Sequence, residues 1–217
     1  MKPRDIIILG VNGNCVDIAE AIDLLAERGT PVKVAGFLDD NVAVQGKLVA
    51  GFRVLGRIAD APKFADARFV CGIGSPQSYR RKLNIIASTG LPVERWMTVV
   101  HPAASVSRTA RLGCGTVVLA NSSIGVNARV GNHVMILQNS VISHDAVVGD
   151  GSVLATGVCV SGMVVLGEST YVGSNAAIRE RLQVGDRALV GIGAVVTRDI
   201  EVDAVVAGNP ARPIRRG

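Results

Sequence analysis

A period of six residues runs through the second half of the chain and limits what this sequence can fold into. From position 100 to position 202, every sixth residue is Val, Leu or Ile. The residue four positions further on is mostly small, with Leu182 and Ile200 as large exceptions, and Gly often follows the aliphatic residue. This hexapeptide pattern is typical of a parallel β-helix, in which three hexapeptides make one triangular coil. The aliphatic series comprises Val100, Val106, Leu112, Val118, Ile124, Val130, Ile136, Ile142, Val148, Leu154, Val160, Leu166, Val172, Ile178, Val184, Val190, Val196 and Val202.

The same period predicts how the coils stack. Residues three hexapeptides apart lie above one another, so the aliphatic side chains form columns inside a prism of about six coils. Such a core suits a chain in which 48% of the residues are hydrophobic but only 3% are aromatic. A solenoid leaves its two ends open, and we expect the upstream chain and the tail after Val202 to cover them. An amphipathic helix is excluded, because its period is 3.6 and because the segment is rich in Gly and β-branched residues.

Charge and cysteine usage narrow the function classes. The net charge of +5 is spread along the chain without a Lys/Arg block beside aromatic residues, which argues against nucleic-acid binding. The apolar run from Ile6 to Val11 is short and ends in turn-forming residues, so we expect a buried strand rather than a signal peptide or a membrane span. The four cysteines are scattered without a metal-like spacing, which suits reduced thiols in a cytoplasm.

The first hundred residues alternate between strand and helix patterns. Apolar runs over 5–9, 32–38 and 68–73 predict strands, and helical patterns follow the first and third of them, the latter over about 77–88. This order predicts a small Rossmann-like βαβ domain with a parallel sheet. We therefore divide the chain into an α/β domain at 1–98 and a β-helix domain at 99–217 that ends in a C-terminal cap.

Ligands of parallel sheets bind at the carboxyl ends of the strands. The Gly-rich turn after the first strand either permits a tight turn or approaches a phosphate at the helix N-terminus. The paired carboxylates after the second strand either cap the next segment or accept hydrogen bonds from a ribose or a base. The candidate residues at these strand ends are Gly10, Gly13, Asn14, Asp39, Asp40, Gly74 and Ser75.

One histidine and one acid stand out in the nearly uncharged stretch VISHDAVVGDGSVLATGVCVSG at 141–162. His144 comes two residues after the inward Ile142, at a corner where side chains point outward. A neutral imidazole there could accept a proton and Asp145 could fix its tautomer, while the alternative is a solvated corner histidine. Gly162 lies three hexapeptides after His144, so its backbone N–H is predicted to neighbour the ring.

Several short motifs form a set along the chain. They are IIILGVNGN at 6–14, FLDD at 37–40, VCGIGS at 70–75 with Arg80 following, VVHPAASVS at 99–107, SHD at 143–145 and AGNPARPI at 207–214. Together with the hexapeptides, this set resembles the sugar acetyltransferases that include sialic-acid O-acetyltransferases and nucleotide-amino-sugar N-acetyltransferases. The resemblance covers nearly the whole chain.

The resemblance implies a left-handed β-helix that assembles as a homotrimer, with acetyl-CoA in the groove between subunits and the sugar held partly by the N-terminal domain. It makes His144 the catalytic base, Asp145 the acid beside it, and the Gly162 N–H the partner of the thioester carbonyl. It implies substrate contacts for the strand-end residues named above and for Arg80. For acetyl-CoA, the implied residues are Gly162, Asn209, Pro210, Ala211 and Arg212.

Some positions leave alternatives open or depart from the pattern. Residues 209–211 either reverse the chain near the CoA groove or cap the last coil. The tail arginines Arg212, Arg215 and Arg216 meet either the CoA phosphates or solvent. Relatives often carry histidines where this chain has Val153 and Asn14, which affects substrate contacts more than the chemistry.

We therefore predict an acetyl-CoA-dependent N-acetyltransferase for a nucleotide-linked amino sugar, with direct attack in a ternary complex and His144 as general base. The alternatives are O-acetylation of a sugar hydroxyl, as on sialic acid, and a non-enzymatic β-helix scaffold. Cys159 is not needed as a nucleophile, and we expect it on the outer wall of the prism. No metal site is expected, because the three histidines are not spaced by whole coils. We expect His133 at the surface and His101 in a structural role at the domain junction.

Overall fold

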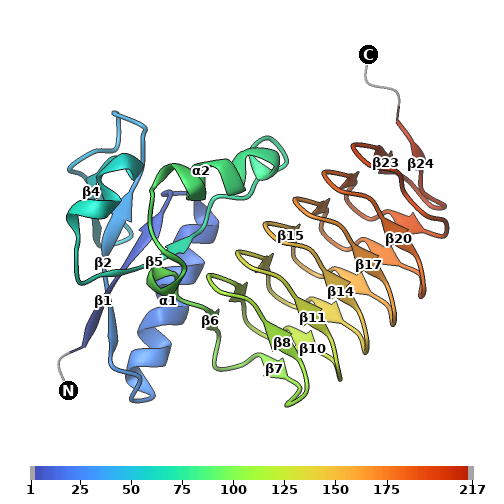
Figure 1. Ribbon diagram of the computed structural model, residues 1–217, viewed down its shortest axis with the longest axis horizontal. Helices are drawn as coiled ribbons and strands as arrows, with labels where there is room; N and C mark the ends of the chain where they lie inside the picture. The colour runs from blue at the N-terminus through green and yellow to red at the C-terminus, as the bar shows by residue number, and fades with distance from the viewer. Residues whose placement is uncertain (1–2, 215–217) are drawn as a thin grey trace.

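The computed structural model describes residues 3–214 and places them in two parts that lie side by side (Figure 1). The first part is a sheet with helices, and the second is a long three-sided prism of short parallel strands. The structure therefore confirms the predicted fold class, an α/β N-terminal part followed by a left-handed parallel β-helix. None of the helices within residues 3–214 is long and apolar enough to cross a membrane.

The N-terminal part is built on a five-stranded sheet. Its elements are β1 (Arg4–Leu9), α1 (Gly13–Glu27), β2 (Val32–Leu38), β3 (Leu48–Val49), β4 (Phe52–Gly56), η1 (Ile58–Lys63), β5 (Arg68–Cys71), η2 (Tyr79–Arg81), α2 (Lys82–Ser88) and η3 (Val93–Arg95). The strand order is β3-β4-β2-β1-β5, with parallel pairing throughout except between β3 and β4. The parallel sheet was predicted, whereas the β3–β4 hairpin was not.

The predicted helix at 77–88 is shorter in the structure, because α2 begins only at Lys82. Ser75 and Ser78 form a turn in front of it, in which the Ser75 N–H donates to Ser78 Oγ at 2.9 Å. A 3-10 helix, η2, follows before α2. Side-chain bonds of serine to nearby backbone groups compete with the helix in this way.

The β-helix consists mostly of two-residue strands that recur every six residues. They are β6 (Val99–Val100), β7 (Ser105–Val106), β8 (Arg111–Leu112), β9 (Val117–Val118), β10 (Ser123–Ile124), β11 (Arg129–Val130), β12 (Met135–Ile136), β13 (Val141–Ile142), β14 (Val147–Val148), β15 (Val153–Leu154), β16 (Cys159–Val160), β17 (Val165–Leu166), β18 (Tyr171–Val172), β19 (Ala177–Ile178), β20 (Gln183–Val184), β21 (Leu189–Val190), β22 (Val195–Val196), β23 (Val205–Ala207) and β24 (Arg212–Pro213). Ile124 pairs with Ile142, Ile142 with Val160 and Val160 with Ile178, which confirms that each coil takes three hexapeptides. These aliphatic side chains form the buried core of the prism.

The Gly that follows the aliphatic residue serves the close approach of neighbouring coils. A Cβ on Gly113 would lie 2.5 Å from the carbonyl carbon of Gly131 in the next coil. Left-handed backbone is used elsewhere in the corners, as at Asn127 (φ 58) and Asn139 (φ 60). Asn tolerates that conformation better than most side chains do, so the corner sequence fits its geometry.

The last coil departs from the period, and the expectation for Val202 is wrong. Val184 pairs with Ile200 rather than Val202, so the coil is shortened by two residues. Ile200 is buried in the core, whereas Val202 is 52% exposed. The large side chain of Ile200 thus takes the inward place that the period assigned to Val202.

The N-terminal part covers one face of the prism. The outward side chains of β9, β12, β15, β18 and β21 on this face are apolar, and they pack in one cluster with α1 and the sheet. Gly74 shows how close the two parts lie, because a Cβ on it would be 2.6 Å from Met135 Cε and 2.8 Å from Val153 Cγ2. The first hundred residues therefore lie along the side of the prism, rather than only at its end.

His133 is buried under this N-terminal part, so the expectation of a surface histidine is wrong. It is 9% exposed, and its ring meets Trp96 edge to face at 4.8 Å between centroids. Burial, together with the charge of Lys82, lowers the pKa of His133 to about 4. The corner position was predicted correctly, but the outward side of this corner is covered by another part of the chain.

Lys82 lies in the same interface and should weaken the fold at neutral pH. It is 1% exposed, and its Nζ has no hydrogen-bond partner among the described residues. Burial lowers the pKa of Lys82 from 10.5 to about 8. This shift means that the folded protein disfavours the charged form of the side chain by roughly 3 kcal/mol.

We expect Lys82→Met to raise the free energy of unfolding at pH 7 by about 3 kcal/mol, because it removes a buried charge and keeps the volume. In the wild type, the folded state releases this proton above about pH 8 and the unfolded state only above about 10.5, so this contribution to stability rises with pH between those values. Denaturant unfolding of both proteins at pH 7 and pH 10 measures the difference, which should shrink at the higher pH. An equal difference at both pH values would contradict this account.

Candidate active site

His144 lies at an exposed corner directly after β13, and its ring is held by the next residue. The side chain is 57% exposed, and Nδ1 lies 2.9 Å from Oδ2 of Asp145. The other oxygen of Asp145 accepts a hydrogen bond of 3.1 Å from Asn127 Nδ2. Hydrogen bonds from His144 and Asn127 lower the pKa of Asp145, so this group is an ionised acceptor. Nδ1 must therefore carry the proton, and Nε2 of a neutral ring is left as the basic nitrogen.

Gly162 lies against that nitrogen, as the coil spacing predicts. A Cβ on Gly162 would be 2.6 Å from His144 Nε2 and 2.7 Å from Cε1. Only glycine leaves room for the ring in this position. Among residues 3–214, no acceptor takes the Gly162 N–H, whereas Met163 N–H donates to His144 O at 3.0 Å. A base and an available backbone donor thus lie next to each other on one edge of the prism.

A polar cavity of about 550 Å³ lies beside Asp145, the partner of His144. Asp145, Asn127 and Thr109 line one side, and Arg111 and Arg129 line the other. The two arginines pair in register on β8 and β11, and both are exposed. Two exposed arginines on neighbouring strands, in a cavity that Asp145 also lines, suit an anionic ligand.

The faces on either side of the His144 corner are partly apolar. Val141 and Val165 are 39% and 41% exposed, and Cys159 points outward as expected. Exposed apolar side chains gathered in one place mark interaction surfaces. A single chain leaves this surface bare.

The strand ends of the N-terminal sheet come together at one edge, as predicted. Asn12 caps α1 and donates through Nδ2 to Gly72 O at 3.3 Å, which joins the turns after β1 and β5. Gly10 has φ +97, whereas a Cβ on Gly13 would meet nothing within 4 Å. Gly10 is thus required by the tight turn, and Gly13 leaves open space in front of the helix. Asn14 is half-buried in the first turn of α1.

The two acids after β2 both cap backbone groups. Asp39 accepts from Asn41 N–H at 2.8 Å, and Asp40 accepts from Ile58 N–H at 3.0 Å. Asp40 thereby fixes the start of η1. At the third strand end, Gly74 is buried against the prism and Ser75 forms the turn with Ser78.

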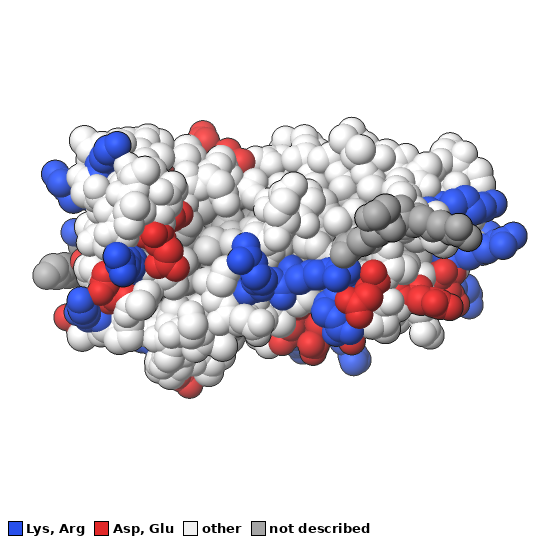
Figure 2. Space-filling model, turned by 90° about the horizontal axis from the view of Figure 1, so that it is seen from above, with Lys and Arg blue, Asp and Glu red and all other residues white. Residues whose placement is uncertain are grey.

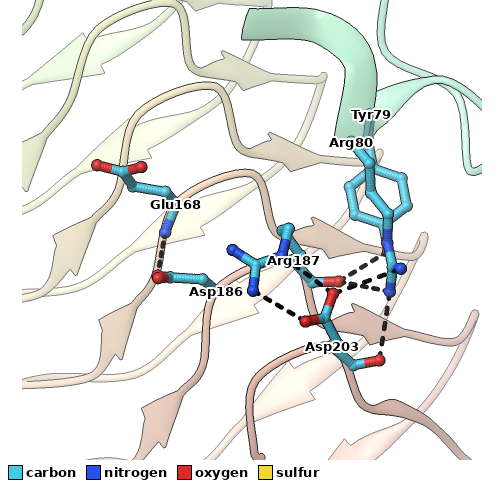
Figure 3. A network of polar contacts seen from close by, with 6 residues as sticks. All are labelled: Tyr79, Arg80, Glu168, Asp186, Arg187 and Asp203. Carbon is cyan, nitrogen blue, oxygen red and sulfur yellow. Dashed lines mark hydrogen bonds and ion pairs between the residues drawn. The ribbon is translucent and has the colours of Figure 1, made fainter. Parts of the chain in front are cut away.

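Arg80 is turned toward the β-helix. Its guanidinium donates to Arg187 O and Asp203 O (Figure 3). These two residues lie after β20, at a corner of the prism other than that of His144, which follows β13. The position of the histidine that relatives often carry, Val153, is fully buried beneath the N-terminal part and faces no open site.

The tail closes the top of the prism. Ala211 N–H donates to Val195 O at 2.8 Å, and β24 returns antiparallel to β23. Arg212 and Ala211 line a cavity of about 400 Å³ above the last coil. Asn209 and Pro210 are exposed in the preceding turn. Arg215 and Arg216 lie outside the described residues.

The sequence reasoning missed Asn127 and Gln138. Asn127 lies one coil before Asp145, so the stacking rule that placed Gly162 would also have placed it. Gln138 donates through Nε2 to Asp17 on α1 at 2.9 Å, a contact over 121 positions that no period signals. His101 has a structural role, since its Nδ1 accepts from Ala103 N–H at 2.9 Å.

Charged side chains form no single-sign block on the face shown in Figure 2, where Lys or Arg and Asp or Glu lie next to one another along the β-helix. Within residues 3–214, no three His, Cys, Asp or Glu side chains gather as a metal site.

Comparison with known proteins agrees with this geometry. The family described as bacterial transferase hexapeptide (six repeats) matches residues 127–162, which include His144 and Gly162. The acetyltransferase domain of PglB from Neisseria gonorrhoeae, solved in complex with acetyl coenzyme A, is 28% identical over 98% of this chain and 100% of that chain, with a TM-score of 0.84. PerB from Caulobacter crescentus, solved with CoA and GDP-perosamine, is 24% identical over 97% of each chain with a TM-score of 0.85. WeeI from Acinetobacter baumannii is 23% identical over 97% of this chain and 100% of that chain, with a TM-score of 0.81. No curated protein sequence matches this chain.

The fold and the hexapeptide repeat are those of left-handed β-helix acetyltransferases. Over nearly its full length, this chain is similar to the acetyltransferase domain of PglB, and this likeness favours an enzyme over the alternative of a non-enzymatic scaffold.

Proposed function

We propose that this protein transfers an acetyl group from acetyl-CoA to the amine of a nucleotide-linked amino sugar. The observation that carries the proposal is the corner at which Asp145 orients His144 while Gly162 packs against Nε2 of the ring. The likeness to PglB, which was solved with acetyl coenzyme A, supports acetyl-CoA as the cosubstrate. The likeness to PerB, which was solved with GDP-perosamine, supports a nucleotide-linked acceptor.

In the proposed reaction, the acceptor amine attacks the thioester carbonyl directly. His144 Nε2 takes the proton that the amine loses, and the ionised Asp145 stabilises the imidazolium through Nδ1. The Gly162 N–H donates to the oxyanion that forms on the carbonyl oxygen. Collapse of this intermediate breaks the carbon–sulfur bond and forms the amide, and the imidazolium proton leaves with the thiolate or to solvent. No side chain of the protein forms a covalent intermediate.

We assign the acceptor nucleotide to the strand ends of the N-terminal sheet at Gly10–Asn14, Asp39–Asp40 and Gly74–Ser75. Ligands of parallel sheets bind at such edges, and the open space in front of Gly13 faces the N-terminus of α1. Arg111 and Arg129 supply positive charge near His144 for a phosphate-bearing ligand. The tail residues 209–212 are assigned to the CoA groove as well as to the cap.

A homotrimer is the proposed assembly, and a cytoplasm with reduced thiols is the proposed location. The trimer is supported by the exposed apolar side chains of Val141 and Val165 on both sides of the His144 corner. Contact between subunits would cover these side chains and turn the exposed corner into a crevice. The free state of the four cysteines agrees with a reducing compartment.

A thiol-release assay tests this function. Purified protein is mixed with acetyl-CoA and a panel of acceptors: nucleotide-linked amino sugars, the matching nucleotide sugars with a hydroxyl at the same carbon, free amino sugars, and sialic acid. We expect CoA release with a nucleotide-linked amine and an amide in the product by mass spectrometry. Release only with a hydroxyl acceptor would replace the proposal by O-acetylation, and release with none would reject it.

A further inference from the structure

Arg80 lies at the end of the turn that we assign to the acceptor nucleotide, and its guanidinium reaches the β-helix. Arg80 Nε donates to Tyr79 Oη at 2.8 Å. One terminal nitrogen donates to Arg187 O at 3.0 Å and to Asp203 O at 3.2 Å. The other lies 3.4 Å from the Asp203 carboxylate. The guanidinium is thus committed to the corner of the last coils (Figure 3).

Tyr79 adds a second tie to the same place. Its side chain is 2% exposed, its Oη donates to Arg187 O at 2.9 Å, and its ring lies 5.7 Å from that of Tyr171. Arg187 is itself held by two hydrogen bonds to the Asp203 carboxylate, of 3.0 and 2.8 Å. Asp203 therefore lies between the guanidinium groups of Arg80 and Arg187. It holds in place the backbone oxygens to which Tyr79 and Arg80 donate their hydrogen bonds.

The turn that leads from β5 to Tyr79 and Arg80 is also held where it begins, at Gly74. Gly74 packs flat against Met135 and Val153, so the segment 74–80 is fastened to the prism at both ends. Ser75 and Ser78 brace the turn in between. A binding turn that is held in this way loses little conformational freedom when its ligand arrives.

We propose that Arg80 is a positioning residue: acting through Arg187 and Asp203, it holds the 74–78 turn in its ligand-binding conformation against the β-helix. This inference rests on the proposed function, because it takes that turn to bind the acceptor nucleotide. Partly exposed ion pairs contribute little to global stability, so loss of Arg80 should loosen the turn without unfolding the prism. His144 lies on a different corner, so the acetyl-transfer step itself should be unaffected.

The test compares Arg80→Ala, Arg80→Lys, Asp203→Asn and the double variant Arg80→Ala/Asp203→Asn in the full chain. Asn suits position 203, because the backbone there has φ 61. We expect each single variant to raise the KM for the acceptor about tenfold, and the double variant to be no worse than either single one, with kcat and the KM for acetyl-CoA within about twofold. Hydrogen exchange of the peptide covering 74–81 should become faster in all four. Glu168→Gln is the matched control, because this acid lies along the same corner with its carboxylate turned away from Arg80 (Figure 3).

Two results would overturn the inference. If Arg80→Ala raises the KM while Asp203→Asn does not, and lysine restores it, then Arg80 contacts the acceptor directly. If neither the KM nor hydrogen exchange changes, the contacts of Arg80 with Arg187 and Asp203 have no effect on the turn. Failure of the wild type to acetylate any acceptor would instead reject the proposed function, while hydrogen exchange would still report whether Arg80 and Asp203 order the turn.

Discussion

Replacing His144 by Ala should lower kcat by ~10²–10⁴ and leave acetyl-CoA affinity near that of the wild type. The expected loss is large because Nε2 is the basic nitrogen at this corner, with Nδ1 bound to Asp145. The fold should not suffer, since the side chain is 57% exposed and lies outside the core. Steady-state kinetics and calorimetric titration with CoA measure the two quantities.

Two variants make this test specific. Asp145→Asn keeps a side chain suited to the left-handed backbone at that residue (φ 58) but removes the charge, so it should lose less activity than His144→Ala. His101→Ala changes a histidine in a structural turn and should leave kcat unchanged. An unchanged kcat in His144→Ala would remove this residue as the base.

Gly162→Ala should reduce kcat by about 10²-fold in a protein that still folds, because a displacement of a catalytic group by about 1 Å can cost that much. The added Cβ would lie 2.6 Å from Nε2, and the exposed ring is the part that can move away. The backbone N–H of residue 162 remains in the variant, so the loss of kcat measures the displacement of the His144 ring. Kinetics together with a thermal melt separate this effect from misfolding.

The His144→Ala background supplies the control for Gly162→Ala. With the imidazole absent, the added methyl group has no ring to displace, so the second substitution should cost little further activity. Equal losses in both backgrounds would show that the methyl group obstructs a substrate rather than the histidine. A loss of the fold in the single variant would contradict the assignment of the ring as the yielding part.

The hexapeptide period predicted the prism in detail, and the reason is physical. Each aliphatic side chain must point inward and each coil closes after three hexapeptides, so register follows from counting, as for Ile142 on Val160. The same count placed Gly162 on His144. It failed at Val202, where a coil loses two residues, because a count carries no information about where it stops applying.

Contacts between the two parts of the chain were beyond the sequence. His133 occupies a corner like that of His144, and only the packing of Trp96 over it decides that it is buried. Arg80 follows the VCGIGS motif, yet its partners on the β-helix lie more than a hundred positions away. Local patterns describe each part, whereas the surface between them depends on how the parts meet.

The N-terminal part follows the prism from β6 to β21 on one face, and this has a consequence for how the chain comes apart. A bare solenoid can unravel from a free end one coil at a time, because each coil touches only its neighbours. Here the late coils are bound to Tyr79 and Arg80, and the early ones to α1, so fraying at the far end must also detach the covering N-terminal part. The first hundred residues thus join the early and late coils into one unit, so we expect the β-helix to unfold cooperatively rather than coil by coil.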